Sequence, residues 1–206
     1  MDIIIFANGE QIKKRIIDKI FPKLSKEKII IACDGAAQIC ENLNIKPDVI
    51  VGDFDSYHGN DEIEKIYLRN QDFTDLQKAI KFAYSYSPQR IIIFSAFGKR
   101  LDHTIANILT FYYQISQSIE LNVYDNYGEF RILYPGKNFI KNIENKTISF
   151  FSLSKIKDLE LIGFKYNFSN NKSLDYFIGV SNIVEKDIAM VSFSEGRLIM
   201  YIPFSV

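Results

Sequence analysis

Short apolar runs alternate with segments of helical periodicity along the first part of the chain. The runs are continuously apolar and rich in isoleucine and valine, which is typical of strands buried on both faces of a sheet. They occupy residues 2–7, 28–33, 48–53 and 90–97. Apolar residues three and four positions apart predict helices over residues 10–21, 36–43, 74–86 and 103–117. The alternation predicts an α/β fold, with a parallel Rossmann-like sheet and helices on both faces.

After Leu121 the helical periodicity disappears. Alternating, aromatic-rich runs separated by Gly, Asn and Ser take its place, which predicts a C-terminal antiparallel β-sandwich. The runs lie at 121–136, 146–154, 158–168 and 187–204. Residues 194–197, Ser-Glu-Gly-Arg, are typical of the turn of a final hairpin. We therefore expect two domains, residues 1–122 and residues 123–206.

Composition excludes several function classes. The 25 Lys and Arg balance the 25 Asp and Glu, so the overall basic charge of a nucleic-acid or anionic-membrane binder is missing. The sequence has neither a basic leader with an apolar core nor an apolar stretch long enough to span a bilayer, which favours a cytoplasmic location. Cys33 and Cys40 have no metal-ligand spacing and are expected to be buried in the core.

Acidic residues gather where predicted strands end or helices begin. They are Asp34, Asp53, Asp55, Asp72, Asp75 and Asp102. Ligands bind beyond the carboxyl ends of the strands in an open parallel sheet, so these carboxylates should converge there. Converging carboxylates repel one another unless a cation lies among them. Oxygen ligands favour Mg²⁺, which proteins commonly hold with one or two carboxylates and the phosphates of a nucleotide.

Each of these residues has a simpler interpretation. A single aspartate at such a position is often a turn former or a helix N-cap, which contributes about 1 kcal/mol. Asp102 is a good candidate for a cap, and Thr74 with Gln77 is expected to form a capping box. Asp53 and Asp55 together are harder to explain in this way, because one turn needs only one of them.

A second candidate feature is the stretch Gly98-Lys99-Arg100, which follows a predicted strand and precedes a predicted helix. Backbone N–H groups and a guanidinium at such a position bind phosphate well. A solvated loop with two ordinary basic residues is the alternative. The sequence contains no Walker P-loop.

Four of these stretches resemble, in order and spacing, the motifs of thiamine pyrophosphokinases. They are CDGAA at 33–37, PDVIVGDFDS at 47–56, QDFTDLQKAI at 71–80 and GKRLDHTIANI at 98–108. LIGFKYNF at 161–168, GVSN at 179–182 and SEGRLIMYI at 194–202 are similar to the C-terminal β-sandwich of that family. The resemblance covers nearly the whole chain.

The resemblance implies a Mg²⁺-dependent transfer of diphosphate from ATP to the hydroxyl of thiamine, which gives thiamine diphosphate and AMP. It also implies a homodimer, with thiamine between the α/β domain of one subunit and the sandwich of the other. The implied catalytic residues are Asp53, Asp55, Asp72 and Arg100, and the three aspartates are the implied metal ligands. Further implied residues are Asp34, Gly35, Gln71, Thr74, Asp75, Lys99 and Asp102 for ATP and Ser181 and Asn182 for thiamine.

The sequence departs from the family pattern at three positions. Ala36 stands where a second glycine is common, Gln71 where many bacterial members have lysine, and Lys99 where glycine is frequent before the arginine. Two alternative functions stay open at this point. One is a Mg²⁺-dependent phosphohydrolase, or a diphosphotransferase acting on another alcohol. The other is a module that senses a nucleotide or thiamine without turnover.

Overall fold

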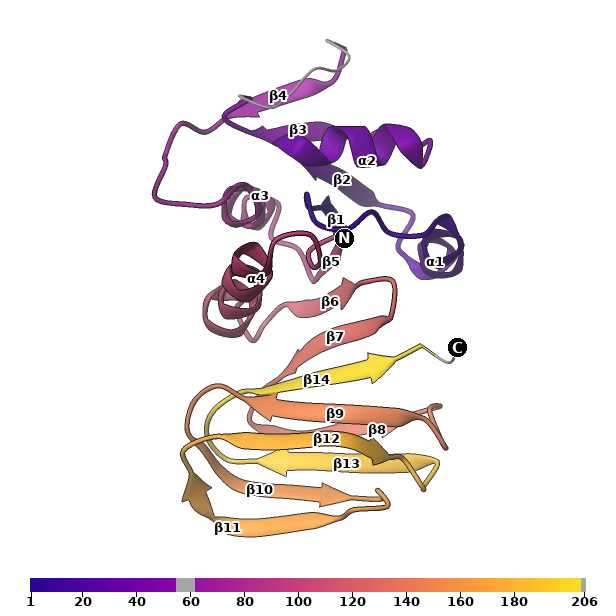
Figure 1. Cartoon of the computed structure of the whole chain (residues 1–206), viewed down its shortest axis with the longest axis vertical. Helices are drawn as coiled ribbons and strands as arrows, with labels where there is room; N and C mark the ends of the chain where they lie inside the picture. Colours follow the sequence, from indigo (N-terminus) through magenta and orange to yellow (C-terminus); the bar gives the residue numbers. More distant parts are fainter. Residues whose placement is uncertain (55–61, 205–206) are drawn as a thin grey trace. The chain divides into compact units, whose positions relative to one another are not determined.

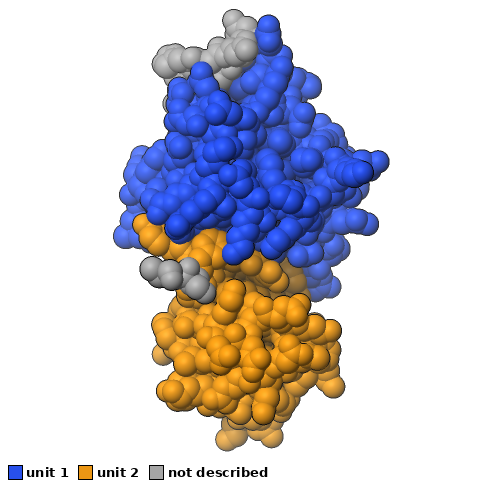
Figure 2. Space-filling view, turned by 90° about the vertical axis from the view of Figure 1, so that its right-hand side faces the viewer, with its two compact units in different colours: residues 1–126 blue, residues 127–206 orange. Residues whose placement is uncertain are grey.

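The computed structural model describes residues 1–54 and 62–204. The chain divides into two compact units, Met1–Asn126 and Tyr127–Val206 (Figure 2). Asp55 lies outside the described residues, so its role as a metal ligand stays a prediction. Within the described ranges no helix is long and apolar enough to cross a membrane.

The first unit is built on a parallel sheet, as the apolar runs predicted. Its strand order is β6-β5-β1-β2-β3-β4, and each neighbouring pair is parallel. The strands are β1 (Asp2–Phe6), β2 (Lys28–Cys33), β3 (Val49–Gly52), β4 (Glu64–Tyr67), β5 (Arg90–Phe94) and β6 (Glu120–Tyr124). The central strands are buried on both faces, and every residue of β1 is buried. This burial explains their unbroken runs of isoleucine and valine.

Helices cover both faces of this sheet. The chain moves from β1 through β2 to β3 in one direction, and α1 (Lys14–Ile20) and α2 (Ala37–Asn42) lie on one face (Figure 1). It then returns to β5 and β6 on the other side of β1, and α3 (Asp75–Tyr84) and α4 (Leu101–Gln114) lie on the opposite face. Crossover connections are right-handed, so reversing the direction of travel changes the face. The reversal creates a switch point between β1 and β5.

β6 is the element at which the first unit ends. The sequence pattern assigned Val123 and Tyr124 to the second domain, but both belong to β6 and pair in parallel with Ile93 and Phe94 of β5. The first compact unit accordingly continues to Asn126. Asn126 also accepts a hydrogen bond from the Lys13 amide at 2.8 Å, within the same unit.

A partly buried ion pair joins β1 to β5. The carboxylate of Asp2 accepts hydrogen bonds from Nε and Nη2 of Arg90 at 3.1 and 2.6 Å and from the Ser25 amide at 2.7 Å. Burial by itself would raise the pKa of Asp2, but the hydrogen bonds from Arg90 and Ser25 outweigh it, so the pKa lies below the ordinary value of 3.8. A carboxylate with a lowered pKa stabilises the fold above its ordinary pKa, and that contribution is lost as the pH falls through the lowered value.

We therefore expect Asp2→Asn to lower the free energy of unfolding at pH 7 by roughly 1.5–3 kcal/mol, the range for hydrogen bonds to charged groups. The difference from the wild type should shrink as the pH falls below about 4, because the carboxyl is protonated first in the unfolded state and then, as the pH passes the lowered pKa, in the folded state. Urea titrations at pH 7 and pH 3 measure both values. An equal difference at the two pH values would contradict the assignment.

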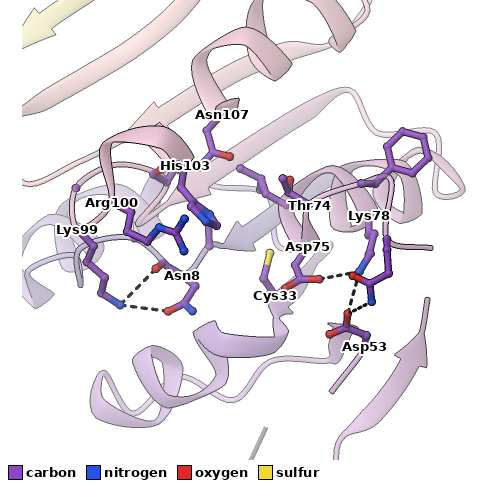
Figure 3. Close-up of a pocket in the computed structure, with 17 residues that line it drawn as sticks. Asn8, Cys33, Asp53, Thr74, Asp75, Lys78, Lys99, Arg100, His103 and Asn107 are labelled. Atoms are coloured by element: carbon purple, nitrogen blue, oxygen red, sulfur yellow. Dashed lines mark hydrogen bonds and ion pairs between the residues drawn. The ribbon is translucent and has the colours of Figure 1, made fainter. Parts of the chain in front are cut away.

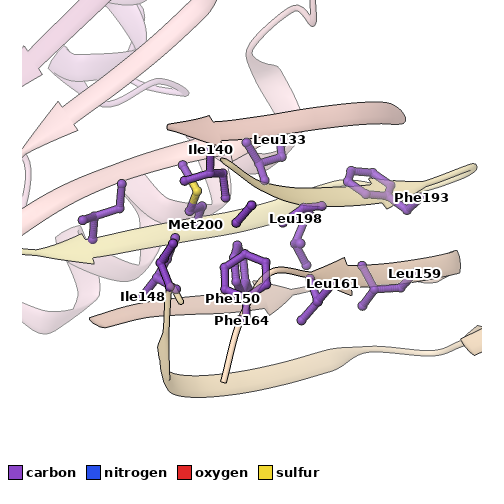
Figure 4. Packing of buried hydrophobic residues seen from close by; sticks show 14 of the residues in the cluster. Leu133, Ile140, Ile148, Phe150, Leu159, Leu161, Phe164, Phe193, Leu198 and Met200 are labelled. Carbon is purple, nitrogen blue, oxygen red and sulfur yellow. The ribbon is translucent and has the colours of Figure 1, made fainter. Parts of the chain in front are cut away.

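The second unit is an antiparallel β-sandwich, as predicted. One sheet has the order β12-β9-β14-β7 and the other β11-β10-β13-β8. The strands are β7 (Gly128–Leu133), β8 (Gly136–Lys141), β9 (Thr147–Ser152), β10 (Ile156–Ile162), β11 (Phe168–Leu174), β12 (Phe177–Ile183), β13 (Ile188–Phe193) and β14 (Leu198–Pro203). Buried side chains fill the core between the sheets, and the rings of Phe150 and Phe164 pack edge to face with centroids 5.5 Å apart (Figure 4).

The predicted final hairpin is wrong. Strand β13 pairs with β8 and β10, whereas β14 pairs with β7 and β9, so residues 194–197 carry the chain from one sheet to the other. Gly196 has a φ of +101°, and a Cβ there would lie 2.4 Å from the carbonyl oxygen of Lys155. The segment does turn, but local sequence does not specify which sheet receives the next strand.

Candidate active site

A cavity of about 420 Å³ opens at the carboxyl ends of the parallel strands (Figure 3). Its walls come from the loops after β1 and β5, from Cys33 at the end of β2, from Asp53 after β3, and from the start of α3 and α4. Because β1 and β5 flank the switch point, this is where a doubly wound sheet binds its ligand. The volume lies within the usual range for small-molecule sites.

The loops after β1 and β5 are joined along the backbone. The Gly9 amide donates to the carbonyl of Ser95 at 2.6 Å, and the Glu10 amide donates to that of Phe97 at 2.7 Å. A Cβ on Gly9 would lie 2.4 Å from both the Ser95 and Phe97 oxygens, so only glycine allows this approach. The contact fixes the position of Asn8, which lines the cavity.

One part of the wall is cationic. It carries Lys99 and Arg100, which come from the loop after β5, and the ring of His103 in the first turn of α4 also lines the cavity. Lys99 has a φ of +56°, and its ammonium group donates to the backbone oxygen and to Oδ1 of Asn8 at 3.3 and 3.2 Å. Arg100 donates through Nε to Asp102 at 3.1 Å, and this hydrogen bond lowers the pKa of Asp102 to about 2. Asp102 therefore stays ionised and orients the guanidinium over the whole neutral range.

Another part of the wall is acidic and surrounds a buried lysine. Asp53 accepts a hydrogen bond on Oδ2 from Nε2 of Gln71 at 2.9 Å, and Nζ of Lys78 lies 3.6 Å from the same oxygen. Lys78 also donates to Oδ1 of Asp75 at 3.0 Å. Burial by itself would lower the pKa of Lys78, but Asp75 and Asp53 outweigh it and the pKa is raised. Lys78 is therefore charged.

The N-terminus of α3 carries the capping box that the sequence predicts. Oγ1 of Thr74 accepts from the Gln77 amide at 3.3 Å, and the Gln77 side chain accepts from the Thr74 amide at 2.9 Å, which completes the expected capping box. Asp75 follows in the first turn, where the helix dipole favours a negative charge.

The structure brings some of the expected site residues together and leaves others apart. Those on the cavity wall are Asp53, Gln71, Thr74, Asp75, Lys99 and Arg100. Within the described part of the chain, the wall does not include Asp34, Gly35, Asp72 or Asp102. Asp72 is exposed, and its amide donates to the side chain of Asn70.

Two of the residues away from the wall have a packing role. Asp34 is buried against Gly52, where an added Cβ would lie 2.5 Å from the Asp34 Cβ. Gly35 leaves room for the side chain of Asn8, because a Cβ on Gly35 would lie 2.1 Å from the Asn8 Nδ2. Asp34 and Gly35 therefore contribute to the packing next to the cavity wall that the described residues form, and do not line the cavity.

The expected thiamine residues lie on β12 in the second unit. Asn182 is buried and bridges the backbone of Tyr166, donating through Nδ2 to its oxygen at 2.8 Å and accepting from its amide at 3.0 Å. Ser181 has a φ of +57°, within an irregularity of the β12–β9 pairing, and its amide donates to Oγ of Ser149. The Asn182 side chain therefore organises the Tyr166 loop.

Four wall residues with polar or charged side chains were not recognised from the sequence: Asn8, Lys78, His103 and Asn107. Asn8 follows a buried strand, the same signal that identified the aspartates. His103 and Asn107 are one turn apart on a helix that starts beside Arg100. Lys78 carries no such signal, because on an ideal helix it lies opposite the face shared by Leu76, Ala79 and Ile80.

The donor chemistry of the acidic wall suits a hard cation. Among the described residues no group of three or more His, Cys, Asp or Glu is arranged to hold a metal. The two carboxylates, Asp53 and Asp75, are nevertheless the kind of ligand set that Mg²⁺ uses when phosphate oxygens complete its coordination.

Comparisons with known proteins agree over both units. Residues 22–123 match the family model for the thiamin pyrophosphokinase catalytic domain, and residues 137–198 match the model for the vitamin B1 binding domain of the same enzymes. The chain is 31% identical to a thiamine pyrophosphokinase of Bacillus subtilis over 198 residues, which cover 91% of this chain and 92% of the relative.

Solved structures give the same result. A crystal structure of thiamine pyrophosphokinase from Bacillus subtilis aligns over 100% of both chains, with a TM-score of 0.84 and 26% identity. The enzyme from Candida albicans aligns with a TM-score of 0.80 at 19% identity, over 99% of this chain and 89% of its own, and shows the shared fold. With both of its domains matched, the chain belongs to the thiamin pyrophosphokinase family of enzymes.

Proposed function

We propose that the cavity binds ATP together with Mg²⁺ and that the enzyme transfers the terminal diphosphate of ATP to the hydroxyl of thiamine. The observation that carries this proposal is the pairing, on one cavity at the switch point, of a cationic wall with an acidic wall. Lys99 and Arg100 suit the phosphates, and Asp53 and Asp75 suit the metal that accompanies them. The vitamin B1 binding domain matched by residues 137–198 supports thiamine as the acceptor.

In the proposed reaction the hydroxyl oxygen of thiamine attacks the β-phosphorus of ATP. The bond from that phosphorus to the oxygen bridging the α- and β-phosphates breaks, and AMP leaves. Such transfers depend on positioning and charge stabilisation more than on covalent catalysis. Arg100 stabilises the negative charge of the transferring group, and a carboxylate of the acidic wall accepts the hydroxyl proton. Mg²⁺, when bound, would neutralise charge on the phosphates.

The metal ligands proposed from the resemblance are Asp53, Asp55 and Asp72. Asp53 is on the cavity wall, whereas the side chain of Asp72 is exposed and outside the wall formed by the described residues. Asp75 occupies the wall instead. We therefore propose Asp53 and Asp75 as the described carboxylates that hold the metal, with Asp55, two positions after Asp53 in the sequence, as a further ligand.

The homodimer is part of the same proposal. Leu101, Ile105 and Leu109 recur every four residues along α4, so they share one face, and they are 72%, 49% and 43% exposed. On β12, Ile178 and Val180 are 63% and 62% exposed. Clustered exposed apolar side chains mark interaction surfaces. A second copy of the chain is the partner that we propose to cover these faces.

We expect Leu109→Glu to convert a dimer into monomers and to lower thiamine-dependent turnover, because the carboxylate would be buried without a partner. Light scattering after size-exclusion chromatography measures the mass, and Gln114→Glu at the exposed end of the same helix serves as the matched control. A Leu109→Glu variant that stays dimeric would remove this face of α4 from the interface.

The proposed reaction is tested by AMP release from ATP and Mg²⁺, with and without thiamine. Thiamine-dependent AMP formation, with an equal amount of thiamine diphosphate, is expected. AMP or phosphate released regardless of thiamine would instead identify a hydrolase. No release in either mixture would favour a binding module or another acceptor alcohol.

A further inference from the structure

Lys78 links two carboxylates that come from different elements. Asp53 follows β3, and Asp75 is the first residue of α3. The ammonium group lies 3.6 Å from Oδ2 of Asp53 and 3.0 Å from Oδ1 of Asp75 (Figure 3). The Lys78 side chain is 5% exposed, compared with 16% for Asp53 and 38% for Asp75. The cation therefore lies between the two carboxylates on the cavity wall and is largely shielded from solvent.

Burial makes this ion pair different from an ordinary surface pair. Lys14 and Asp18 on α1 are also 3.6 Å apart, but both side chains are about 60% exposed, and such pairs contribute little. A buried ammonium group is costly unless carboxylates and hydrogen bonds satisfy it, and removing one partner leaves the others unbalanced. The placement of Lys78 is thus tied to the placement of Asp53 and Asp75.

The lysine is anchored by the first turn of its helix. Its amide donates to the Thr74 oxygen at 2.9 Å, in the turn that the capping box fixes. Asp53, in contrast, lies beyond the end of β3, next to Phe54 with a φ of +61°. An anchored helix thus presents a cation to a carboxylate that lies just beyond the end of a strand. The attraction opposes the mutual repulsion of the two carboxylates.

We propose that Lys78 is a positioning residue: its ammonium group sets the separation and orientation of the Asp53 and Asp75 carboxylates on the cavity wall. The inference rests on the proposed function, because those carboxylates act on the metal and phosphates of the nucleotide. Lys78 acts through these two carboxylates, although its own side chain also borders the cavity. Groups that orient metal ligands in this way commonly change affinity or activity by 10–100-fold when they are removed.

The test compares Lys78→Met, which keeps the length and removes the charge, with Lys14→Met as the matched control. The probe is α,β-methylene-ATP with Mg²⁺, because its methylene bridge replaces the oxygen at which the proposed transfer breaks ATP. Calorimetric titration should show roughly 10–100-fold weaker binding for Lys78→Met. Lys14→Met should stay within about 2-fold of the wild type, since its pair is exposed.

A double-mutant cycle separates positioning from general stabilisation. Lys78→Met, Asp75→Asn and the double variant are titrated with the same probe below their unfolding temperatures. If Lys78 acts through Asp75, the two losses are not additive, and the coupling should be at least about 5-fold. Lys78→Arg keeps a cation and should recover binding to within about 5-fold of the wild type. It also serves as the test if Lys78→Met does not fold.

Three results would overturn the proposal. They are wild-type or tighter probe binding by Lys78→Met, additive losses in the cycle, and a loss in Lys78→Arg equal to that in Lys78→Met. If Lys78 only repelled the metal, Lys78→Met would bind the probe with Mg²⁺ more tightly than the wild type. A wild-type protein that binds the probe but releases no thiamine-dependent AMP would count against the proposed function, while the binding cycle would still test Lys78.

Discussion

Replacing Asp53 with asparagine is expected to lower the rate of thiamine-dependent AMP formation by at least about 100-fold. Removing one electrostatic contact to the transition state typically lowers kcat by this much. Asparagine has nearly the same shape and keeps an oxygen to accept the hydrogen bond from Gln71, so the wall should survive. It lacks the negative charge that a divalent cation needs, and it leaves Lys78 with one of its two described carboxylates. Initial rates over a range of Mg²⁺ concentrations measure the loss.

The control for Asp53→Asn is Asp18→Asn, which removes an exposed carboxylate from a lysine pair on α1. It should retain wild-type activity. Circular dichroism melts of both variants separate a catalytic loss from unfolding. The same loss of activity is expected for Asp55→Asn on sequence grounds. Near-normal rates for Asp53→Asn would remove this residue from the proposed metal site.

Replacing Arg100 with alanine is expected to lower kcat by roughly 100-fold, because a guanidinium directed at the transferring phosphates stabilises charge that develops in the transition state. Its side chain is 72% exposed, so removing it should leave the fold unchanged. Lysine at this position keeps the charge but loses the two-pronged contact with Asp102, and an intermediate kcat is expected. Steady-state kinetics with ATP as the varied substrate separate kcat from KM.

Arg15→Ala, at an exposed position of α1, is the matched control for Arg100→Ala. Asp102→Asn provides a second comparison, since Asp102 orients Arg100 from outside the described cavity wall. Its effect on kcat should be smaller than that of Arg100→Ala. An equal or larger effect would mean that Asp102 itself contacts the substrate. A rise in KM with kcat unchanged in Arg100→Ala would limit the arginine to ground-state binding.

Much of the fold could be predicted because its strands are buried in a simple way. Strands such as β1 and β5 are shielded on both faces, and the resulting continuous apolar runs are visible without any partner. The edges are harder to assign. The Leu-Asn-Val-Tyr run of β6 has the pattern of a sandwich strand, because the same short apolar segment suits a parallel or an antiparallel neighbour.

The candidate site could be predicted as far as residue type and strand ends allow. Asp53 and Arg100 come from strand-end loops, and Asp75 opens a helix whose cap the sequence also predicts. Asp72 belongs to the same motif but lies outside the wall formed by the described residues. Closeness in sequence does not show which residues share a site here, because the turn before a helix directs the side chains of neighbouring residues to different sides.

The sequence by itself determined the two architectures, the buried strands and the kinds of charge that come after them. Tertiary structure decided which loops meet: Gly9 contacts the loop after β5 across a long stretch of chain, β13 and β14 enter different sheets, and Lys78 becomes buried although its helix face is polar. The spacing of apolar residues indicates which face of a helix or strand packs against the core of its own domain. The position of Lys78 depends instead on carboxylates supplied by another element, a long-range contact that no local pattern encodes.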